Sequence, residues 1–311
     1  MKGKKQLKSY LLLALFVFLL FAGVALLSSR QRKSAWNAER SIVNQSIEPG
    51  QFSDKELGIH FTYPKEWGDL KLENSDQEQT KSDEIFFTTG SPQIPMVCYH
   101  IASEKILFVE NGQKVSGTLD GSTKPQQSLK LLMPNGQSKN IYTIPLADVK
   151  NHGSFRWLHF SPQGNYAEVQ LIFWEWSNTL IFDLNSTQKL GLPPSPGDIQ
   201  WSTDEKTLVL VTTVDAFSGE GEDALFVSHT GSPQDLRMVF SRGSKYLPKN
   251  SAKDSQGTNG LDFSDIRIDS TKMVHFHVKL CSTSYCSDES GVDLYNGNFV
   301  YDALKNTLRP N

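Results

Sequence analysis

The sequence predicts a mainly β protein: one N-terminal transmembrane helix, followed by stacked antiparallel sheets, the first of which can belong to a small α+β domain. Three observations predict it. An uncharged run, Tyr10–Ser29, lies between two groups of basic residues. From Phe52 onward, helical periodicity gives way to short runs of Val, Ile, Phe and Thr, punctuated by Gly, Pro, Asn, Asp and Ser. In the C-terminal part, one strand–turn–strand pattern recurs three times.

The first 33 residues have the pattern of a membrane anchor. Four lysines precede Tyr10–Ser29, and Arg30, Arg32 and Lys33 follow it. Twenty helical residues rise about 30 Å, the thickness of a bilayer's hydrocarbon core. A cleaved signal peptide and a buried core helix are the alternatives. The apolar core of 17 residues, Leu11–Leu27, exceeds the roughly 7–15 residues usual in a signal peptide, and no small-x-small cleavage triplet ends it.

The basic residues also predict an orientation and a domain order. Four lysines and the amino terminus before the span, against three basic residues after it, favour a cytoplasmic amino terminus. We therefore expect a single-pass protein of the cell membrane whose C-terminal part is extracytoplasmic. The expected divisions are a cytoplasmic tail and anchor (1–33), a juxtamembrane linker (34–50), a small β-rich or α+β domain (51–120) and a repeat domain (121–311).

The charge of the soluble part limits its partners. Residues 1–33 hold seven basic and no acidic side chains, so the net charge of −3 for the whole chain leaves −10 for residues 34–311. Nucleic-acid binding needs basic patches, and an acidic ectodomain is a poor match for it. The expected partners are the membrane and a protein of the cell envelope, and no cofactor is expected.

Two of the three cysteines lie close together. Cys281 and Cys286 are separated by four residues, and Cys98 is alone. Outside the cytoplasm this pair can form a disulfide, which would stabilise the fold by about 2 kcal/mol for so short a loop. Two free thiols are an alternative. A zinc site with His275 and His277 is another, because strand spacing would point both imidazoles to one face.

Several strands are expected before the repeats. They are Glu84–Thr89, Met96–Ala102 and Lys105–Glu110, with a turn at Asn111-Gly112. The Gly/Ser/Thr/Pro-rich stretch Val115–Gln127 predicts the domain boundary.

The stretch LGIHFTYPKEWGDLKL, Leu57–Leu72, begins this part with alternating apolar residues that stop at Pro64. It matches the pattern G-x-x-F-x-Y-P-x-x-W and resembles the opening of PsbP-like domains over about a dozen residues. The resemblance implies a small extracytoplasmic α+β domain and no activity.

An internal repeat organises the rest of the chain. In each copy an apolar strand enters a polar turn and a second alternating strand follows; the copies are Phe155–Phe173, Asp198–Thr213 and Ser264–Leu280. A third strand with a polar turn recurs after each, at Leu180–Leu190, Leu225–Leu236 and Phe299–Arg309. Leu129–Leu146 has the pattern of the closing hairpin of an earlier unit, and Arg242–Gly260 that of a polar insertion.

The repeat resembles the WD40-like repeats of TolB-type β-propellers, whose turn is typically S-P-D-G. Ser161-Pro162-Gln163-Gly164 keeps three of the four letters, Ser202-Thr203-Asp204-Glu205 keeps two and Asp269-Ser270-Thr271-Lys272 keeps none. The resemblance implies four-stranded blades that bury one another's faces, about four of them in residues 129–311. An ordinary antiparallel sandwich, and an open stack packed on a small first domain, are the alternatives.

No catalytic signature is found in the sequence. The G-x-S-x-G elbow, the phosphate-binding Gly-x-x-x-x-Gly-Lys loop and the His-Glu-x-x-His motif are all missing. Trp174 and Trp176 would lie on one face of a strand. Buried, they would belong to the core between sheets; exposed, they would contact a ligand such as a glycan or a peptide.

We therefore expect a membrane-anchored, extracytoplasmic binding or scaffolding protein without catalytic activity, which contacts proteins or ligands through loops. One alternative is a cell-envelope hydrolase with a scattered site, for which Asp183, Asp215, His275 and His277 would have to meet in one cleft. The other is a sensor module that acts through a membrane partner.

Overall fold

The computed structural model describes residues 49–73, 83–174, 176–193, 196–212, 223–228, 233–248, 260–282 and 292–311. Pro49–Asn311 form one compact unit. Within the described ranges no helix is both long enough and apolar enough to cross a membrane. The predicted anchor, Tyr10–Ser29, lies outside these ranges, as does Cys286.

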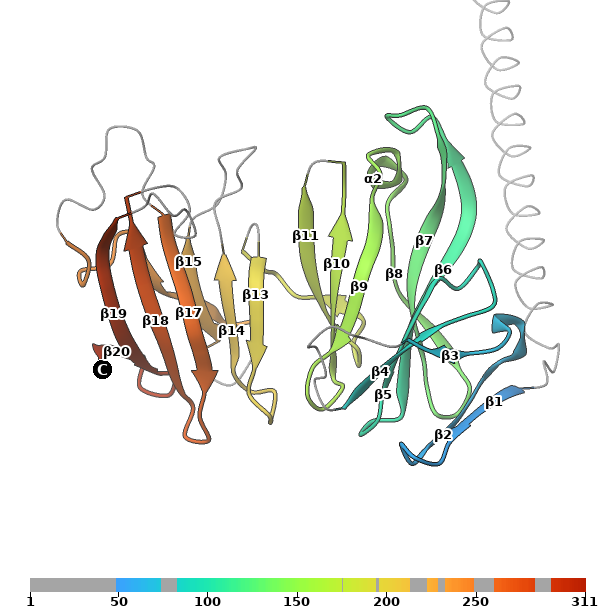
Figure 1. Cartoon of the computed structure of the whole chain (residues 1–311), viewed down its shortest axis with the longest axis horizontal. Coiled ribbons are helices and arrows are strands. Elements are labelled where there is room, and N and C mark those ends of the chain that lie inside the picture. The colour runs from blue at the N-terminus through green and yellow to red at the C-terminus, as the bar shows by residue number, and fades with distance from the viewer. Residues whose placement is uncertain are drawn as a thin grey trace, which may run out of the picture. The chain divides into compact units, whose positions relative to one another are not determined.

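The described chain consists of a first hairpin followed by four sheets, all antiparallel (Figure 1). The first hairpin is β1 (Pro49–Asp54) and β2 (Ile59–Pro64), followed by the short helix η1 (Lys65–Trp67). Sheet 1 contains β3 (Lys71–Leu72), β4 (Glu84–Thr88), β5 (Met96–His100), β6 (Lys105–Ser116), β7 (Thr123–Leu132) and β8 (Ser138–Thr143), after which comes α2 (Leu146–Lys150). Sheet 2 contains β9 (Ser154–Phe160), β10 (Tyr166–Ile172), β11 (Ser177–Asp183) and β12 (Gln188–Lys189). Sheet 3 contains β13 (Pro196–Trp201), β14 (Leu208–Thr212), β15 (Ala224–Ser228) and β16 (Leu236–Ser241). Sheet 4 contains β17 (Gly260–Ile268), β18 (Met273–Cys281), β19 (Asp293–Asp302) and β20 (Thr307–Pro310).

The predicted repeat corresponds to sheets 2, 3 and 4. Each repeated segment supplies the first two strands of a sheet, and each recurring third strand supplies the next. In all three sheets the strands pair in chain order, which is the four-stranded meander expected of a propeller blade. The predicted insertion, Arg242–Gly260, falls in the connection between β16 and β17.

Sheet 1 contains a further copy of this meander. Strands β5 to β8 pair in chain order like the strands of the later sheets, and β3 and β4 extend the same sheet at the β5 edge. Leu129–Leu146 covers the closing hairpin of this sheet, as the sequence predicts. The expected domain boundary between residues 120 and 121 lies in the turn that joins β6 to β7, two strands that pair with each other.

One local prediction is wrong. Asn111 and Gly112 do not form a turn, because β6 continues through them to Ser116. The pairing of β6 with β7 shifts register between Asn111 and Lys114, so the Asn-Gly pair occupies a β-bulge. The Asn111 N–H donates to the carbonyl of Gln93, a partner outside the hairpin.

The first hairpin packs through the alternating side chains of β2. Ile59, Phe61 and Tyr63 are buried while the residues between them are exposed. Phe61 stacks on Tyr99 of β5, with ring centroids 4.5 Å apart, and Trp67 packs on Phe108 of β6 at 4.6 Å. The resemblance of this stretch to PsbP-like domains stays a prediction.

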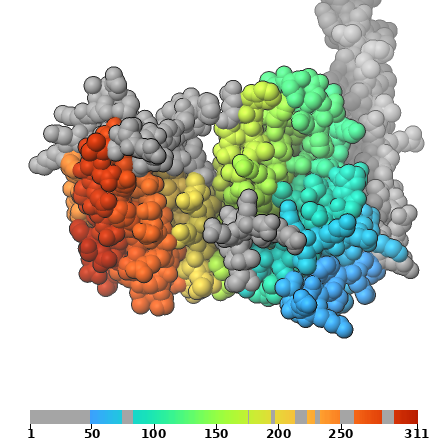
Figure 2. All heavy atoms as spheres, in the orientation of Figure 1, coloured from blue at the N-terminus to red at the C-terminus, as the bar shows by residue number. Residues whose placement is uncertain are grey.

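Four core clusters join the hairpin and the sheets in chain order, and the same order is visible as adjacent bands of colour in Figure 2. The first hairpin packs on sheet 1, sheet 1 and α2 on sheet 2, sheet 2 on sheet 3, and sheet 3 on sheet 4. Among the described residues, none of these clusters joins sheet 4 to the first hairpin. Sheets 1, 2 and 3 therefore each bury one face against the unit that precedes them in the chain and the other face against the sheet that follows.

Candidate functional site

The turn between the first two strands keeps one geometry in sheets 2, 3 and 4. Its fourth residue has a left-handed backbone, with φ of +69° at Gly164, +55° at Glu205 and +67° at Lys272. That conformation favours glycine, and glycine is present only in the first copy. The first residue of each turn accepts a hydrogen bond from the backbone N–H that re-enters the sheet: Ser161 from Tyr166 (2.9 Å), Ser202 from Thr207 (2.9 Å) and Asp269 from Met273 (3.0 Å). The backbone geometry of the turn is therefore the same in all three sheets, although the amino acids at its positions differ.

Two of these fourth residues reach back to the turn of the preceding sheet. The Glu205 carboxylate, 5% exposed, accepts hydrogen bonds from the Ser161 hydroxyl (2.5 Å), the Gln163 N–H (2.5 Å) and the Asn165 amide (2.8 Å). Lys272 forms an ion pair with Asp204. Hydrogen bonds from Lys272 and then from Ser202 lower the pKa of Asp204.

Polar contacts also link sheet 1 to the first turn of sheet 2. Lys105 Nζ donates to the Gly164 carbonyl at 2.7 Å, and burial lowers the pKa of this lysine. Glu84 of β4 accepts from the Phe160 N–H and lies 2.9 Å from Nδ1 of His159. We call this side, where the β5–β6, β9–β10, β13–β14 and β17–β18 turns lie, the turn end. At the turn end, polar contacts link each sheet to the next one in the chain.

The opposite side, the loop end, carries exposed apolar side chains. In an antiparallel meander successive connections alternate between the two ends, so the β6–β7 and β10–β11 connections lie there. Leu119 in the first is 69% exposed, and Trp174 and Trp176 in the second are 60% and 46% exposed. Both tryptophans thus lie in a turn rather than within a strand, and the prediction of one shared strand face does not apply to them.

These side chains belong to one group, which we call the tryptophan patch (Leu119, His152, Phe173, Trp174 and Trp176). The Leu119 N–H donates to the Lys150 carbonyl at the end of α2. His152 packs on Trp174, with ring centroids 4.9 Å apart, and its Nε2 lies 3.5 Å from an Asp120 carboxylate oxygen. Hydrogen bonds from Ser122 and Thr118 lower the pKa of Asp120.

The orientation of the Trp176 side chain is fixed by ring stacking. Its indole stacks on Phe173 with ring centroids 3.7 Å and planes 13° apart. Behind them lies Gly153, where an added Cβ would meet the Phe173 ring at 3.2 Å and the Asp148 carbonyl at 2.7 Å. One face of this indole is therefore fixed against the protein, while nearly half of the side chain stays open to solvent.

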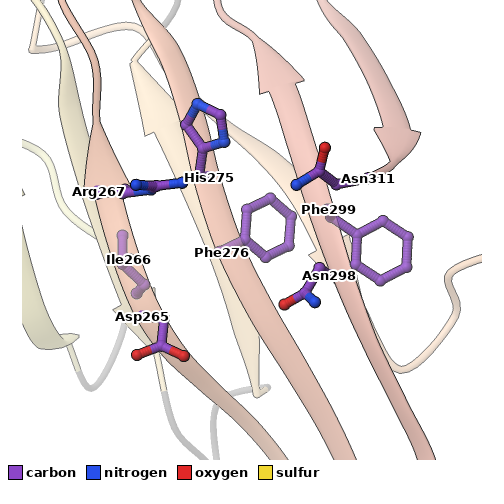
Figure 3. Close-up of a pocket in the computed structure, with 8 residues that line it drawn as sticks. All are labelled: Asp265, Ile266, Arg267, His275, Phe276, Asn298, Phe299 and Asn311. Atoms are coloured by element: carbon purple, nitrogen blue, oxygen red, sulfur yellow. The ribbon is translucent and has the colours of Figure 1, made fainter.

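A second feature is a hollow of about 560 Å³ at sheet 4 (Figure 3). Its lining comes from β17, β18, β19 and the residue after β20: Asp265, Ile266, Arg267, His275, Phe276, Asn298, Phe299 and Asn311. His275 Nε2 lies 3.1 Å from Asp269 Oδ2. Hydrogen bonds, from Thr271 first and also from His275, lower the pKa of Asp269.

The three described members of the expected hydrolase cluster, Asp183, His275 and His277, do not lie in one sheet. His275 and His277 lie on one face of β18, as strand spacing predicts, while Asp183 lies at the end of β11 in another sheet. Asp183 accepts from the N–H groups of Asn185 and Ser186 and so closes its own turn. Asp215 lies outside the described residues.

The cysteines are accounted for in part. Cys281, at the end of β18, is disulfide-bonded, and Cys98 is a buried thiol outside that disulfide. Because Cys286 lies outside the described residues, its pairing with Cys281 stays a prediction. Among the described residues, no group of three or more His, Cys, Asp or Glu side chains could hold a metal ion.

Sequence reasoning singled out the two tryptophans but missed the contacts of Glu205 and Lys272. Their position in the repeat was the available signal, because both stand where the aligned turn has Gly164. A charged residue at a left-handed position that favours glycine indicates that its side chain has a specific partner.

No protein-family model matches the chain, and no curated protein matches it either. Solved structures with a similar arrangement include the β-propeller domain of the Trilobed protease from Pyrococcus furiosus, 14% identical, covering 78% of this chain and 71% of that one at a TM-score of 0.31. TolB from Acinetobacter baumannii is 8% identical over 78% and 67% of the two chains, at 0.26. The Swd1 β-propeller domain from Myceliophthora thermophila is 10% identical over 72% and 81%, at 0.29. At these values we transfer neither function nor site residues from any of these proteins.

Proposed function

We propose that the protein is a membrane-anchored, extracytoplasmic scaffold without catalytic activity, and that it binds a protein partner through the tryptophan patch. The observation that carries the proposal is the exposure of Trp174 and Trp176, 60% and 46%, on a connection held in place by packing. Tryptophan is enriched among the residues that dominate protein–protein binding energy.

The surroundings of the patch support a protein partner. Leu119, Trp174 and Trp176 give it an apolar centre, and Asp120, Lys150 and His152 lie beside them. An apolar centre with a polar rim is the usual composition of such interfaces. The stacking of Trp176 on Phe173 fixes its orientation before binding, which reduces the entropy lost on association.

The partner can be tested by site-specific photocrosslinking in intact membranes. A photoreactive residue at position 174 should give one major crosslinked protein. The same residue at position 304 is the matched control, because Leu304 is 72% exposed but lies in the β19–β20 connection at the turn end. Equal yields of the same product at both positions, or no product at 174, would contradict the proposal.

The proposed location rests on Tyr10–Ser29 and its basic flanks. Protease added to spheroplasts should digest the C-terminal part, and protection should appear only in inverted vesicles. A C-terminal part protected in intact spheroplasts would overturn the proposed orientation while leaving the tryptophan patch as a separate question.

A further inference from the structure

The face of sheet 4 opposite its core cluster carries a row of paired residues, in which Arg267 and Arg309 are exposed and Val300 is buried. Arg267 pairs with His275, His275 with Val300, and Val300 with Arg309 across the four strands. Directly paired residues point to the same side of a sheet. Two guanidinium groups therefore flank His275 and Val300 on one face, while the opposite face of β18 packs into the core through Val274, Phe276 and Val278.

Of the five described arginines, two form ion pairs, and three do not form one within the described chain, namely Arg156, Arg267 and Arg309. Arg237 pairs with Asp235 and Arg242 with Asp223. Arg267 and Arg309 are exposed and form no ion pair or hydrogen bond within the described chain. Arg267 and Arg309 lie on the two outer strands of the sheet, three strand spacings or about 14 Å apart. The Asp269 carboxylate lies 3.1 Å from Nε2 of His275, a member of the row. In a part of the chain with net charge −10, two exposed arginines on one face that have no ion pair among the described residues fit an anion from outside the protein.

Hydrogen-bond donors stand beside the row, around the hollow in Figure 3. His277 Nδ1 and Asn298 Oδ1 are 2.9 Å apart, so the imidazole donates to that amide oxygen and leaves the Asn298 NH₂ group free to donate elsewhere. The Asn311 N–H donates to the Asn298 carbonyl at 2.9 Å and holds Asn311 at the rim. In Figure 3, Asp265 lies at the far end of the hollow from His275 and Asn311, with its carboxylate directed away from them.

We propose that this hollow binds an oxyanion, namely a phosphate, sulfate or carboxylate group carried by a small molecule or a polymer. The Arg267 guanidinium makes the main contact, and the amides of Asn298 and Asn311 donate further hydrogen bonds. Arg309 adds positive charge along the row. A guanidinium donates two parallel hydrogen bonds to such a group, which makes the contact both strong and oriented.

The test uses the full chain in detergent, in a buffer without phosphate, at constant ionic strength set with chloride. Inorganic phosphate is followed by its ³¹P line width and acetate by saturation-transfer proton signals. We expect a dissociation constant on the order of 1 mM for at least one of the two, since one small anion makes few contacts. The better probe separates a phosphate-type ligand from a carboxylate.

The variant is Arg267→Gln, and Arg156→Gln is the matched control, because Arg156 is also exposed and unpaired within the described chain but lies on β9. Arg267→Gln should weaken binding about tenfold or more, as expected for the loss of a charge-assisted contact, and Arg156→Gln should leave it unchanged. Equal losses in both variants, or full binding by Arg267→Gln, would overturn the proposal.

A second variant protects the test against misfolding. If Arg267→Gln does not give the wild-type circular dichroism spectrum, Asn298→Ala replaces it, with an expected loss of about threefold to tenfold. Unchanged phosphate and acetate binding by a folded Asn298→Ala would then refute the site. Variants of Trp174 should bind the anions normally, so failure here and failure of the proposed partner are separate results.

Discussion

Replacing Glu205 by alanine should cost a large share of the stability of the fold. The substitution removes an acceptor for the Ser161 hydroxyl, the Gln163 N–H and the Asn165 amide, and Ser161 itself is 0% exposed. The Ser161 hydroxyl keeps only a longer contact of 3.3 Å to the Tyr166 carbonyl. A hydrogen bond to a charged group contributes about 1.5–3 kcal/mol, and a buried donor left without a partner costs about 1–3 kcal/mol. Because the three contacts are not additive, we expect a loss of about 3–5 kcal/mol.

The backbone at this position provides an internal check. Since φ of Glu205 is +55°, alanine is strained there and glycine is not. Glu205→Gly should therefore be about 1 kcal/mol more stable than Glu205→Ala, although it lacks the same three contacts.

Equilibrium unfolding in urea, followed by tryptophan fluorescence, measures both differences. Lys206→Ala is the matched control, because its exposed side chain stands next to Glu205 in the same turn. A domain of ordinary stability has about 5–15 kcal/mol in total, so the expected loss is readily measured. If Glu205→Ala lay within 1 kcal/mol of Lys206→Ala, the contact between the turns would not hold sheet 2 to sheet 3.

Three further predictions concern other contacts. Gly164→Ala should lower stability by about 2 kcal/mol or more in the same urea assay, because φ is +69° and the new Cβ would lie 2.4 Å from the Ser103 hydroxyl; an unchanged midpoint would contradict the packing. The pKa of Asp204 is lowered from its ordinary 3.8 in the folded protein, so this carboxylate stabilises the fold above about pH 4, and the stabilisation is lost as the pH falls through the lower folded pKa. Below pH 4 the melting temperature of the wild type should therefore fall more steeply with pH than that of Asp204→Asn. Parallel curves of melting temperature against pH would refute this. Non-reducing peptide mapping should recover one crosslinked fragment containing Cys281 and Cys286, whereas alkylation of Cys286 without reduction would exclude the pairing.

The stacked sheets could be predicted because their signal is local. Alternating apolar residues and polar turns are visible within each strand pair, and those segments fold into sheets 2, 3 and 4 as expected. Of the earlier copy, β5–β8, the sequence indicated only the closing hairpin as part of a repeat, because β3 and β4 extend its sheet and because its turn at Ile101–Glu104 shares only the fourth residue, Glu, with one of the other turns. Its geometry is nevertheless similar, with φ of +53° at Glu104 and a hydrogen bond from that N–H to the Ile101 carbonyl.

The candidate sites were harder to predict, because they depend on contacts between distant segments. Trp174 and Trp176 were singled out, but their exposure depends on α2 and the β6–β7 connection beside them. The row from Arg267 to Arg309 depends on a register shift in β17 between Ser264 and Arg267. No pattern in the sequence predicted this shift. A shift of one residue there would turn Arg267 to the opposite face of the sheet.

The packing of each sheet only on its neighbours in the chain has a consequence for how the molecule comes apart. In such an array the total stability approaches a sum of terms for single units and for adjacent interfaces. Damage to one interface should then be felt strongly by two sheets and weakly by the rest. Sheet 4, which shares a described core with one neighbour only, should be the first to open in native-state hydrogen exchange, while sheets 1 and 2 remain protected.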